Sequence, residues 1–392
     1  MKRSLLDRFR RNPYPLYSLL RRATPVFRIP GRDIWLLLDY ESVKRALNDS
    51  ATFSSRAAPP SGKPLNWLIF LDPPEHTKLR GIISRTITPR AIAELEPMIR
   101  RLARELLDSA AVTGTVDLVA DFSAPLPLLV IAEMLGIPVV DRARFLQWAD
   151  AILRLGDSIA GGDAATRAYA SYHAARDDMR LYLENLLRTR THGARGLLAQ
   201  LAAAEVDGER LAFDDILGFF QLLLLAGTET TTNLIGNAVL CFDTNRDQLT
   251  AVVEEPDLLP RAIEEVLRYR SPVQLVFRMT TRDVRIGGKR IPANALVLPV
   301  VGAANRDPAE FASPRAFDIT RSDNHHAGFG HGIHYCLGAA LARLEARVAL
   351  EELLPRLRDF RIEGWEPSTG INVHGPRSLT LKLGELPRPL RS

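Results

Sequence analysis

The stretch from Phe329 to Gly338 reads Phe-Gly-His-Gly-Ile-His-Tyr-Cys-Leu-Gly, and a helical pattern, AALARLEARVALEEL, follows it. Its glycines favour a tight loop whose backbone can come close to a flat ligand. Cys336 comes just before the helix, where free backbone N–H groups and the positive end of the helix dipole stabilise a thiolate. The pattern therefore presents Cys336 as a negatively charged ligand.

Three roles for Cys336 compete on the residues alone. A lone cysteine is often a buried structural residue. Zinc could be bound by Cys336 together with nearby histidines, namely His325, His326, His331 and His334. That set is unusual, because one residue separates His334 from Cys336 and no second cysteine pair lies nearby. The third role is thiolate ligation of a haem iron.

The spacing Phe329-x-x-Gly332-x-His334-x-Cys336-x-Gly338 resembles the haem-binding loop of the cytochrome P-450 family of haem-thiolate monooxygenases. The resemblance implies that Cys336 is the proximal iron ligand of haem b and that Gly338 belongs to the cofactor-binding loop. It also implies that Phe329 packs beside the sulfur and that His334 contacts a haem propionate.

The sequence Glu265-Val-Leu-Arg268 places an acid and a base on one helical face, where they can pair. Such pairs are most often exposed. The resemblance implies instead a buried ion-pair network beneath the haem, completed by a further arginine. Arg321 matches that arginine best, and Arg315 is the alternative.

Residues 226–231, Ala-Gly-Thr-Glu-Thr-Thr, interrupt an apolar helical pattern with poor helix formers. The helix could end at Gly227, but the apolar pattern resumes after this segment. The segment resembles the family's oxygen-binding groove, which carries a catalytic acid–alcohol pair. Glu229 and Thr230 match that pair, so Thr230 would hold a water or dioxygen and Glu229 would relay protons. Ala226 and Gly227 would leave room for the oxygen.

Three further residues match positions that bind the haem propionates in the family. His76 and Arg80 are four residues apart on one helical face, and Arg278 lies at the start of a strand. An exposed basic pair is the alternative interpretation for His76 and Arg80. Two propionates need several donors, which these residues and His334 would supply.

Helical patterns dominate the chain, while residues 273–301 read as strands. Helices are predicted at 89–109, about 214–243, 258–270 and 337–358, a loop at 56–66 and part of a mobile lid at 155–175. No long linker divides the chain, so residues 1–392 are expected to form a single, mainly α domain with a smaller β region. The resemblance implies the cytochrome P-450 fold, a triangular helical prism with haem buried between the long central helix and the helix after Cys336.

Composition limits the classes of function. The 51 basic residues are spread among 46 acids without a long run of like charge, so no nucleic-acid binding is expected. The N-terminal residues lack the apolar stretch of a secretory signal, and the most apolar window, 216–226, is too short to span a membrane. The sequence therefore predicts a cytoplasmic protein without a membrane anchor.

The resemblance implies a monooxygenase that activates dioxygen and inserts one oxygen atom into an apolar small-molecule substrate, for example by hydroxylation. Two cysteines are too few for a fused iron–sulfur domain, so electrons are expected from an iron–sulfur ferredoxin and an NAD(P)H-dependent ferredoxin reductase. Arg343 and Arg347, with Lys78 and Arg85 on another helix, would form a basic docking face. A peroxygenase driven by hydrogen peroxide, which Glu229–Thr230 argues against, and a non-catalytic haem gas sensor or carrier are the alternatives.

Overall fold

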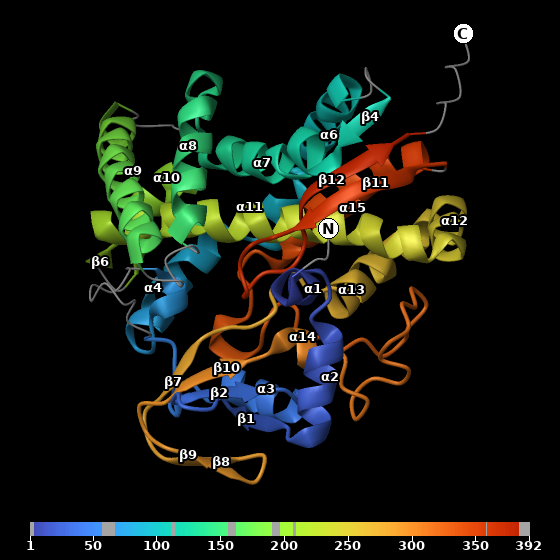
Figure 1. Cartoon of the computed structure of the whole chain (residues 1–392). Coiled ribbons are helices and arrows are strands. Elements are labelled where there is room, and N and C mark those ends of the chain that lie inside the picture. The colour runs from blue at the N-terminus through green and yellow to red at the C-terminus, as the bar shows by residue number, and fades with distance from the viewer. Residues whose placement is uncertain are drawn as a thin grey trace. The chain divides into compact units, whose positions relative to one another are not determined.

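The computed structural model describes residues 4–56, 67–110, 114–155, 162–189, 197–206, 209–357 and 359–383. Two compact units are formed, and each draws on separate parts of the chain. The helical unit comprises residues 54–94 and 127–229, and the mixed unit comprises residues 1–53, 95–126 and 230–392. Helices predominate over a smaller β region, as the sequence predicts (Figure 1).

The helical unit is built from helices and one short hairpin. Its elements are η1 (Leu68–Phe70), α4 (Glu75–Thr86), α5 (Pro89–Ala93), α7 (Pro125–Leu135), η4 (Val139–Asp141), α8 (Arg142–Leu153), α9 (Gly162–Thr189), α10 (Leu197–Ala203), β5 (Glu205–Val206) and β6 (Glu209–Arg210). Residues 57–66 of the predicted loop and 156–161 of the predicted lid lie outside the described residues. Residues 162–175 of that lid form the first half of α9.

The mixed unit contains most of the strands and the helices that carry the cysteine loop. Its helices are α1 (Leu5–Arg11), α2 (Tyr14–Ala23), α3 (Tyr40–Asn48), α6 (Glu96–Ala110), η3 (Val119–Ser123), α12 (Arg246–Glu254), η6 (Pro256–Leu258), α13 (Leu259–Tyr269), α14 (Val301–Ala304), η7 (Gly332–His334), α15 (Ala339–Leu353) and η8 (Leu354–Leu357). Its strands are β1 (Val26–Arg28), β2 (Ile34–Leu37), β3 (Phe53–Ser54), β4 (Thr115–Asp117), β7 (Arg278–Thr280), β8 (Val284–Ile286), β9 (Lys289–Ile291), β10 (Leu296–Pro299), β11 (Arg361–Pro367) and β12 (Pro376–Lys382).

The main sheet brings together strands that are far apart in the sequence. Its order is β1-β2-β10-β7-β3, and β2 runs parallel to β10 with Trp35 opposite Val297. Val297 in turn faces Arg278 across the antiparallel β10–β7 pair. The predicted strand region at 273–301 is confirmed as β7 to β10. A second sheet, β11-β12-β4, lies in the same unit as α6 and α15, which pack against each other.

The long central helix is confirmed as α11 (Phe213–Thr244), which runs without interruption from the helical unit into the mixed unit. The predicted helices at 258–270 and 337–358 are confirmed as α13 and as α15 followed by η8. The helical region predicted at 89–109 is confirmed, but it is interrupted at residues 94–95, so that the chain forms α5 and α6 as two helices. Pro97, in the first turn of α6, has no N–H to continue the hydrogen-bond ladder of α5.

Candidate functional site

Backbone hydrogen bonds and glycine conformations shape the loop before Cys336. The N–H of Cys336 donates to the carbonyl oxygen of Phe329 at 2.9 Å. Gly330 and Gly332 have φ angles of 73° and 67°, in the left-handed region that favours glycine. A Cβ at position 332 would lie 2.7 Å from the carbonyl oxygen of Leu47, at the end of α3. The predicted tight loop is therefore present, and Gly332 is also needed for its packing.

The two cysteines have different surroundings. Cys336 lies three residues before the first residue of α15 and is half-buried. Cys241 lies within α11 and is 1% exposed, and burial raises its pKa to about 12. A thiol with that pKa stays protonated at neutral pH and is a poor metal ligand. Cys336 is therefore the cysteine that is placed to act as a thiolate.

The donor chemistry of the loop fits a haem iron and not a protein-bound metal ion. No group of three His, Cys, Asp or Glu side chains within the described parts of the chain could hold a metal ion. Zinc usually takes four ligands, so the zinc interpretation lacks its ligand set. One accessible thiolate suits an iron whose other ligands are supplied by a prosthetic group, as in haem.

A hydrogen-bonded clamp holds the aromatic residue at the start of the loop. Glu264 of α13 accepts hydrogen bonds from Arg343 of α15, at 2.7 and 2.8 Å, and pairs with His326 Nε2 at 3.1 Å. His326 Nδ1 accepts from the Gly328 N–H, so its proton lies on Nε2, toward Glu264. The guanidinium carbon of Arg343 lies 4.4 Å from the centre of the Phe329 ring. Phe329 is thus fixed from two helices.

The clamp keeps Glu264 ionised. Burial opposes its charge, but hydrogen bonds from Arg343 and His326 outweigh this and lower its pKa to about 2. The sequence motifs did not identify Glu264, because its partners lie 62 and 79 residues away along the chain. The packing of α13 against α15 brings Arg343 to Glu264, and the loop before Cys336 brings His326.

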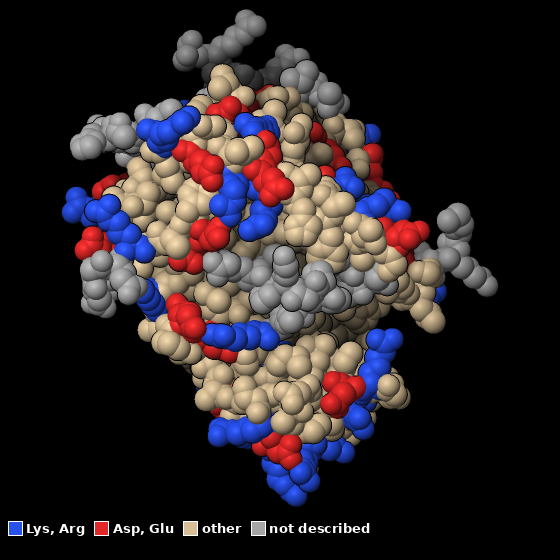
Figure 2. All heavy atoms as spheres, turned by 90° about the vertical axis from the view of Figure 1, so that its left-hand side faces the viewer, with Lys and Arg blue, Asp and Glu red and all other residues tan. Residues whose placement is uncertain are grey.

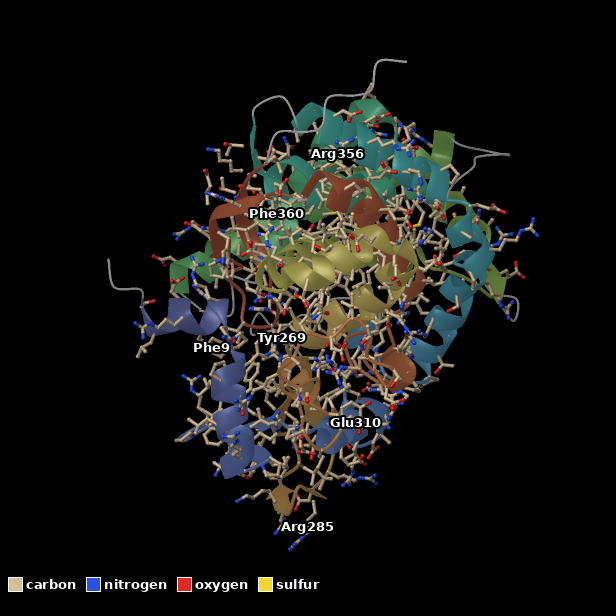
Figure 3. The ribbon with its side chains drawn as sticks, turned by 90° about the vertical axis from the view of Figure 1, so that its right-hand side faces the viewer. Phe9, Tyr269, Arg285, Glu310, Arg356 and Phe360 are labelled. Atoms are coloured by element: carbon tan, nitrogen blue, oxygen red, sulfur yellow. The ribbon has the colours of Figure 1, made fainter. Side chains whose placement is uncertain are left out.

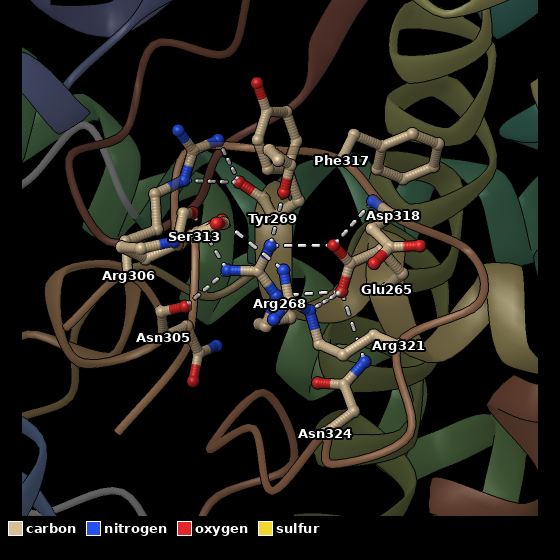
Figure 4. Close-up of polar contacts among 12 residues, drawn as sticks. Glu265, Arg268, Tyr269, Asn305, Arg306, Ser313, Phe317, Asp318, Arg321 and Asn324 are labelled. Atoms are coloured by element: carbon tan, nitrogen blue, oxygen red, sulfur yellow. Dashed lines mark hydrogen bonds and ion pairs between the residues drawn. The ribbon is translucent and has the colours of Figure 1, made fainter. Parts of the chain in front are cut away.

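The Glu265–Arg268 pair is fully buried, as the family resemblance implies. Both side chains are 0% exposed, and Arg268 donates to both carboxylate oxygens of Glu265, at 2.7 and 2.8 Å. Arg268 also donates to the carbonyl oxygens of Asn305, Pro314 and Ala316, at 2.8–3.0 Å (Figure 4). The alternative of an exposed pair is therefore wrong.

Arg321 completes this network. Its Nε lies 3.2 Å from Glu265 Oε2 and its Nη1 donates to the Ala312 carbonyl oxygen. The N–H of Asp318 adds a further hydrogen bond to Glu265, at 2.9 Å. Arg315 instead lies 3.3 Å from Ser18 in an exposed setting, so Arg321 is the third member. The network ties α13 to residues 305–324, the segment that leads into the cysteine loop.

The middle of α11 remains helical despite its threonines and glycine, so the predicted alternative of a helix end at Gly227 is wrong. The buried Thr228 hydroxyl donates a hydrogen bond to the Leu224 carbonyl oxygen of the same helix. A Cβ at position 227 would lie 2.4 Å from the Ile131 side chain, so glycine allows α11 to approach α7 closely. Close packing against α7 therefore gives one structural reason for glycine at position 227.

One stripe of α11 is accessible while its flanks are buried. Ala226 is exposed and Thr230 is half-buried, whereas Leu224 and Thr231 are 0% and 3% exposed. Glu229, next to Thr230, is half-buried, and this burial raises its pKa to about 7. A carboxyl group with this pKa can both donate and accept a proton at neutral pH.

The predicted propionate-binding residues lie on three elements. In the helical unit, His76 and Arg80 are both on α4, and His76 is 1% exposed. Burial and the nearby charge of Arg80 lower the pKa of His76, so the ring is neutral at pH 7. In the mixed unit, Arg278 begins β7 and is 7% exposed, and His334 ends the short helix η7.

The expectation of a basic docking face at Arg343 and Arg347 is wrong as stated. Arg343 is committed to Glu264, and Arg347 pairs with Glu96 at 2.5 Å and with Glu351 at 2.8 Å. Carboxylates therefore balance both positive charges. The other two residues of that expectation, Lys78 and Arg85, lie on α4 in the helical unit.

A buried amide in the first half of α11 links this helix to two other segments of the helical unit. Gln221, 2% exposed, accepts through Oε1 from the indole N–H of Trp67 at 3.0 Å and from the Tyr172 hydroxyl at 3.1 Å. An indole N–H can only donate, so this contact fixes the orientation of the amide. Gln221 lies within the apolar window at 216–226, and the sequence carries no local sign of its partners Trp67 and Tyr172.

Comparisons with known proteins point to one family. The family model described as Cytochrome P450 matches residues 173–367. The vitamin D(3) 25-hydroxylase of Pseudonocardia autotrophica is 40% identical over 359 residues, which cover 88% of this chain and 86% of the relative. The solved structure of cytochrome P450 CYP109Q5 from Chondromyces apiculatus has 38% identity and a TM-score of 0.87, with 96% of each chain covered.

A further similar structure is that of CYP109E1 from Bacillus megaterium in complex with corticosterone. It has 35% identity and a TM-score of 0.88, and the match covers 96% of this chain and 99% of that one. None of the helices among the described residues is long and apolar enough to cross a bilayer.

Proposed function

The chain belongs to the cytochrome P450 family of haem-thiolate monooxygenases, and from this premise we propose that it hydroxylates apolar substrates of about the size of a steroid. The observation that carries the haem-thiolate assignment is the contrast between the two cysteines: Cys336 is half-buried just before α15, whereas burial raises the pKa of Cys241, within α11, to about 12 and keeps it protonated. A relative named as a vitamin D(3) hydroxylase and a similar structure with corticosterone bound support the substrate class.

We propose that residues 1–392 act as one functional domain around haem b. The haem, when bound, supplies an iron whose thiolate ligand favours cleavage of the O–O bond. Cys336 provides that thiolate, Phe329 shields it in the loop, and Gly338 ends the cofactor-binding loop at the N-cap of α15. The clamp from Glu264 keeps Phe329 in place.

Four basic side chains are proposed to hold the two propionates. Arg80 and Arg278 supply permanent positive charge, and charge-assisted hydrogen bonds are the strong kind. His76 and His334 supply ring N–H donors. Because burial keeps His76 neutral, it donates one hydrogen bond and adds no charge.

Glu229 and Thr230 are proposed to deliver protons beside the accessible Ala226. With a pKa of about 7, Glu229 can release a proton at neutral pH and take up another from solvent. Thr230 follows it directly and can hold a water in line with its hydroxyl. Proton delivery is needed when dioxygen is the oxidant, which favours the monooxygenase over a peroxygenase.

Electrons are proposed to come from an external iron–sulfur ferredoxin and its NAD(P)H-dependent reductase. The chain has only two cysteines and so holds no cluster of its own. Because Arg343 and Arg347 are paired with carboxylates, we expect only a weak effect of their charge reversal on ferredoxin-dependent reduction.

The test combines binding with turnover. Steroids titrated into the ferric protein are expected to shift the Soret band as they displace the iron-bound water. With a surrogate ferredoxin, reductase and NADH, the protein is expected to form hydroxylated steroid, and with hydrogen peroxide alone it is expected to form little. Turnover driven equally well by peroxide would instead assign a peroxygenase, and binding without product would assign a sensor or carrier.

A further inference from the structure

Helix α2 is apolar on its outer side as well as its inner side. Tyr14 and Tyr17 are both 6% exposed and pack with Leu38 in the core of the mixed unit. On the outer side, Leu16 and Leu19 are 44% and 65% exposed. They lie about 60° apart around the helix, so they form one stripe. A helix on a protein surface normally has polar residues on its outer side, so this exposed apolar stripe indicates a binding surface.

Helix α1 continues the apolar surface. Its Phe9 faces inward, with its ring centre 6.0 Å from that of Tyr17, while Leu5 and Leu6 are 84% and 51% exposed. Figure 3 shows α1 and α2 one after the other along the same margin of the molecule. Among the ten large hydrophobic side chains that the structure shows as exposed, four fall within residues 5–19, so the two helices concentrate them.

The same segment carries the excess charge of the chain. Residues 1–23 contain seven basic residues and one acid, a formal charge of +6, whereas the whole chain has +5. The remaining residues therefore sum to −1. On the face shown in Figure 2, basic and acidic side chains are interspersed over most of the surface. Arg8 on α1 and Arg22 on α2 are exposed near the leucines.

We propose that the outer sides of α1 and α2 bind the surface of an anionic phospholipid bilayer. Amphipathic helices rich in Leu and Arg lie in the bilayer interface, with apolar side chains among the acyl chains and basic ones at the headgroups. A second copy of residues 1–23 would bring a further formal charge of +6, and this like charge opposes self-association. An acidic protein partner would complement the positive charge but would not account for the four exposed leucines.

Flotation of the haem-loaded protein with vesicles tests the proposal. We expect binding to phosphatidylcholine vesicles that contain phosphatidylglycerol, little binding to pure phosphatidylcholine, and release by salt. The double variant Leu16→Ser/Leu19→Ser is expected to lose binding. Arg22→Gln is expected to weaken it roughly fivefold, the effect of one basic side chain near such a surface.

The matched control is Leu146→Ser/Leu181→Ser, which alters two leucines of the helical unit that are 51% and 59% exposed. This control is expected to bind vesicles like the wild type. The proposal would be overturned if both double variants lost binding equally, or if neutral vesicles bound the protein equally well. It would also be overturned if Leu16 and Leu19 were needed for a dimer or for a complex with an acidic protein, and not for vesicle binding. Turnover of a water-soluble substrate is measured in a separate assay, because the proposed membrane binding does not depend on the reaction.

Discussion

Replacing Glu265 by alanine removes the centre of the network beneath the cysteine loop. Its carboxylate accepts from Arg268, Arg321, Asn324 and the backbone N–H of Asp318. In Glu265→Ala the guanidinium of Arg268 stays at 0% exposure without a counter-charge. We expect Glu265→Ala to lower the free energy of unfolding and to weaken the anchoring of the segment before Cys336.

The size of the effect follows from the contacts that remain. Leaving one member of a buried ion pair uncompensated costs about 3–5 kcal/mol. Arg268 keeps three backbone carbonyl partners, which stabilise part of its charge, so we expect the lower end, about 3 kcal/mol. An unfolding entropy of about 2.1 cal/mol/K per residue gives roughly 0.8 kcal/mol/K over 392 residues, and hence a fall in Tm of about 4 °C.

The assay measures the Tm and the haem content of each purified variant. The control is Arg377→Ala, which breaks an ion pair with Glu366 whose side chains are 61% and 58% exposed. An exposed pair contributes at most about 1 kcal/mol, so the control is expected to keep its haem and lose about 1 °C or less. Haem content is expected to fall only in Glu265→Ala.

A Glu265→Ala protein with full haem content and a Tm within about 1 °C of wild type would refute this reasoning. Arg268 would then have found another counter-charge or reached solvent. The conservative variant Glu265→Gln keeps hydrogen-bond acceptors but not the charge. It is expected to lie between wild type and alanine, since part of the network survives.

Three further changes test the rest of the site. Thr230→Ala is expected to keep substrate binding and NADH consumption but to release mostly hydrogen peroxide. The control Thr231→Ala is expected to form more product per NADH than Thr230→Ala. If Thr230→Ala formed as much product per NADH as wild type, the proton-delivery role would be removed. Burial raises the pKa of Glu229 from 4.5 to about 7. Between these two pH values the folded protein keeps a proton on Glu229 that the unfolded chain has released. The free energy of unfolding therefore falls as pH rises from about 4.5 to about 7. Glu229→Gln is expected to flatten that part of the Tm–pH curve, and an unchanged curve would show that Glu229 titrates normally. Arg343→Ala is expected to free Phe329 and shift the haem reduction potential, with Arg347→Ala, whose partners are Glu96 and Glu351, as the control that leaves it unchanged.

The sequence was most informative where one short segment carries both the chemistry and the local structure. The loop before Cys336 combines left-handed glycines with a helix start, and both are local properties that a residue pattern records. The long helix α11 was likewise predictable, because its apolar pattern resumes beyond Gly227. The family resemblance also favoured Arg321 over Arg315, and the ion pair with Glu265 agrees.

The parts that could not be predicted depend on contacts between distant segments. The clamp on Phe329 requires Glu264 and Arg343, 79 residues apart, and neither carries a local sign of the other. The same holds for Arg347, whose pairing with Glu96 across 251 residues neutralises a charge that the sequence alone leaves free. Gly227 shows a third case, because its need for glycine comes from Ile131 on another helix.

The central claim is that Cys336 supplies the thiolate that binds the haem iron. The direct measurement is the absorption spectrum of the reduced, CO-bound protein in Cys336→Ala and Cys241→Ala. We predict that Cys241→Ala keeps the strongly red-shifted band of thiolate-ligated haem and that Cys336→Ala loses it. A Cys336→Ala protein that retained this band, or a Cys241→Ala protein that lost it while still folded, would contradict the assignment.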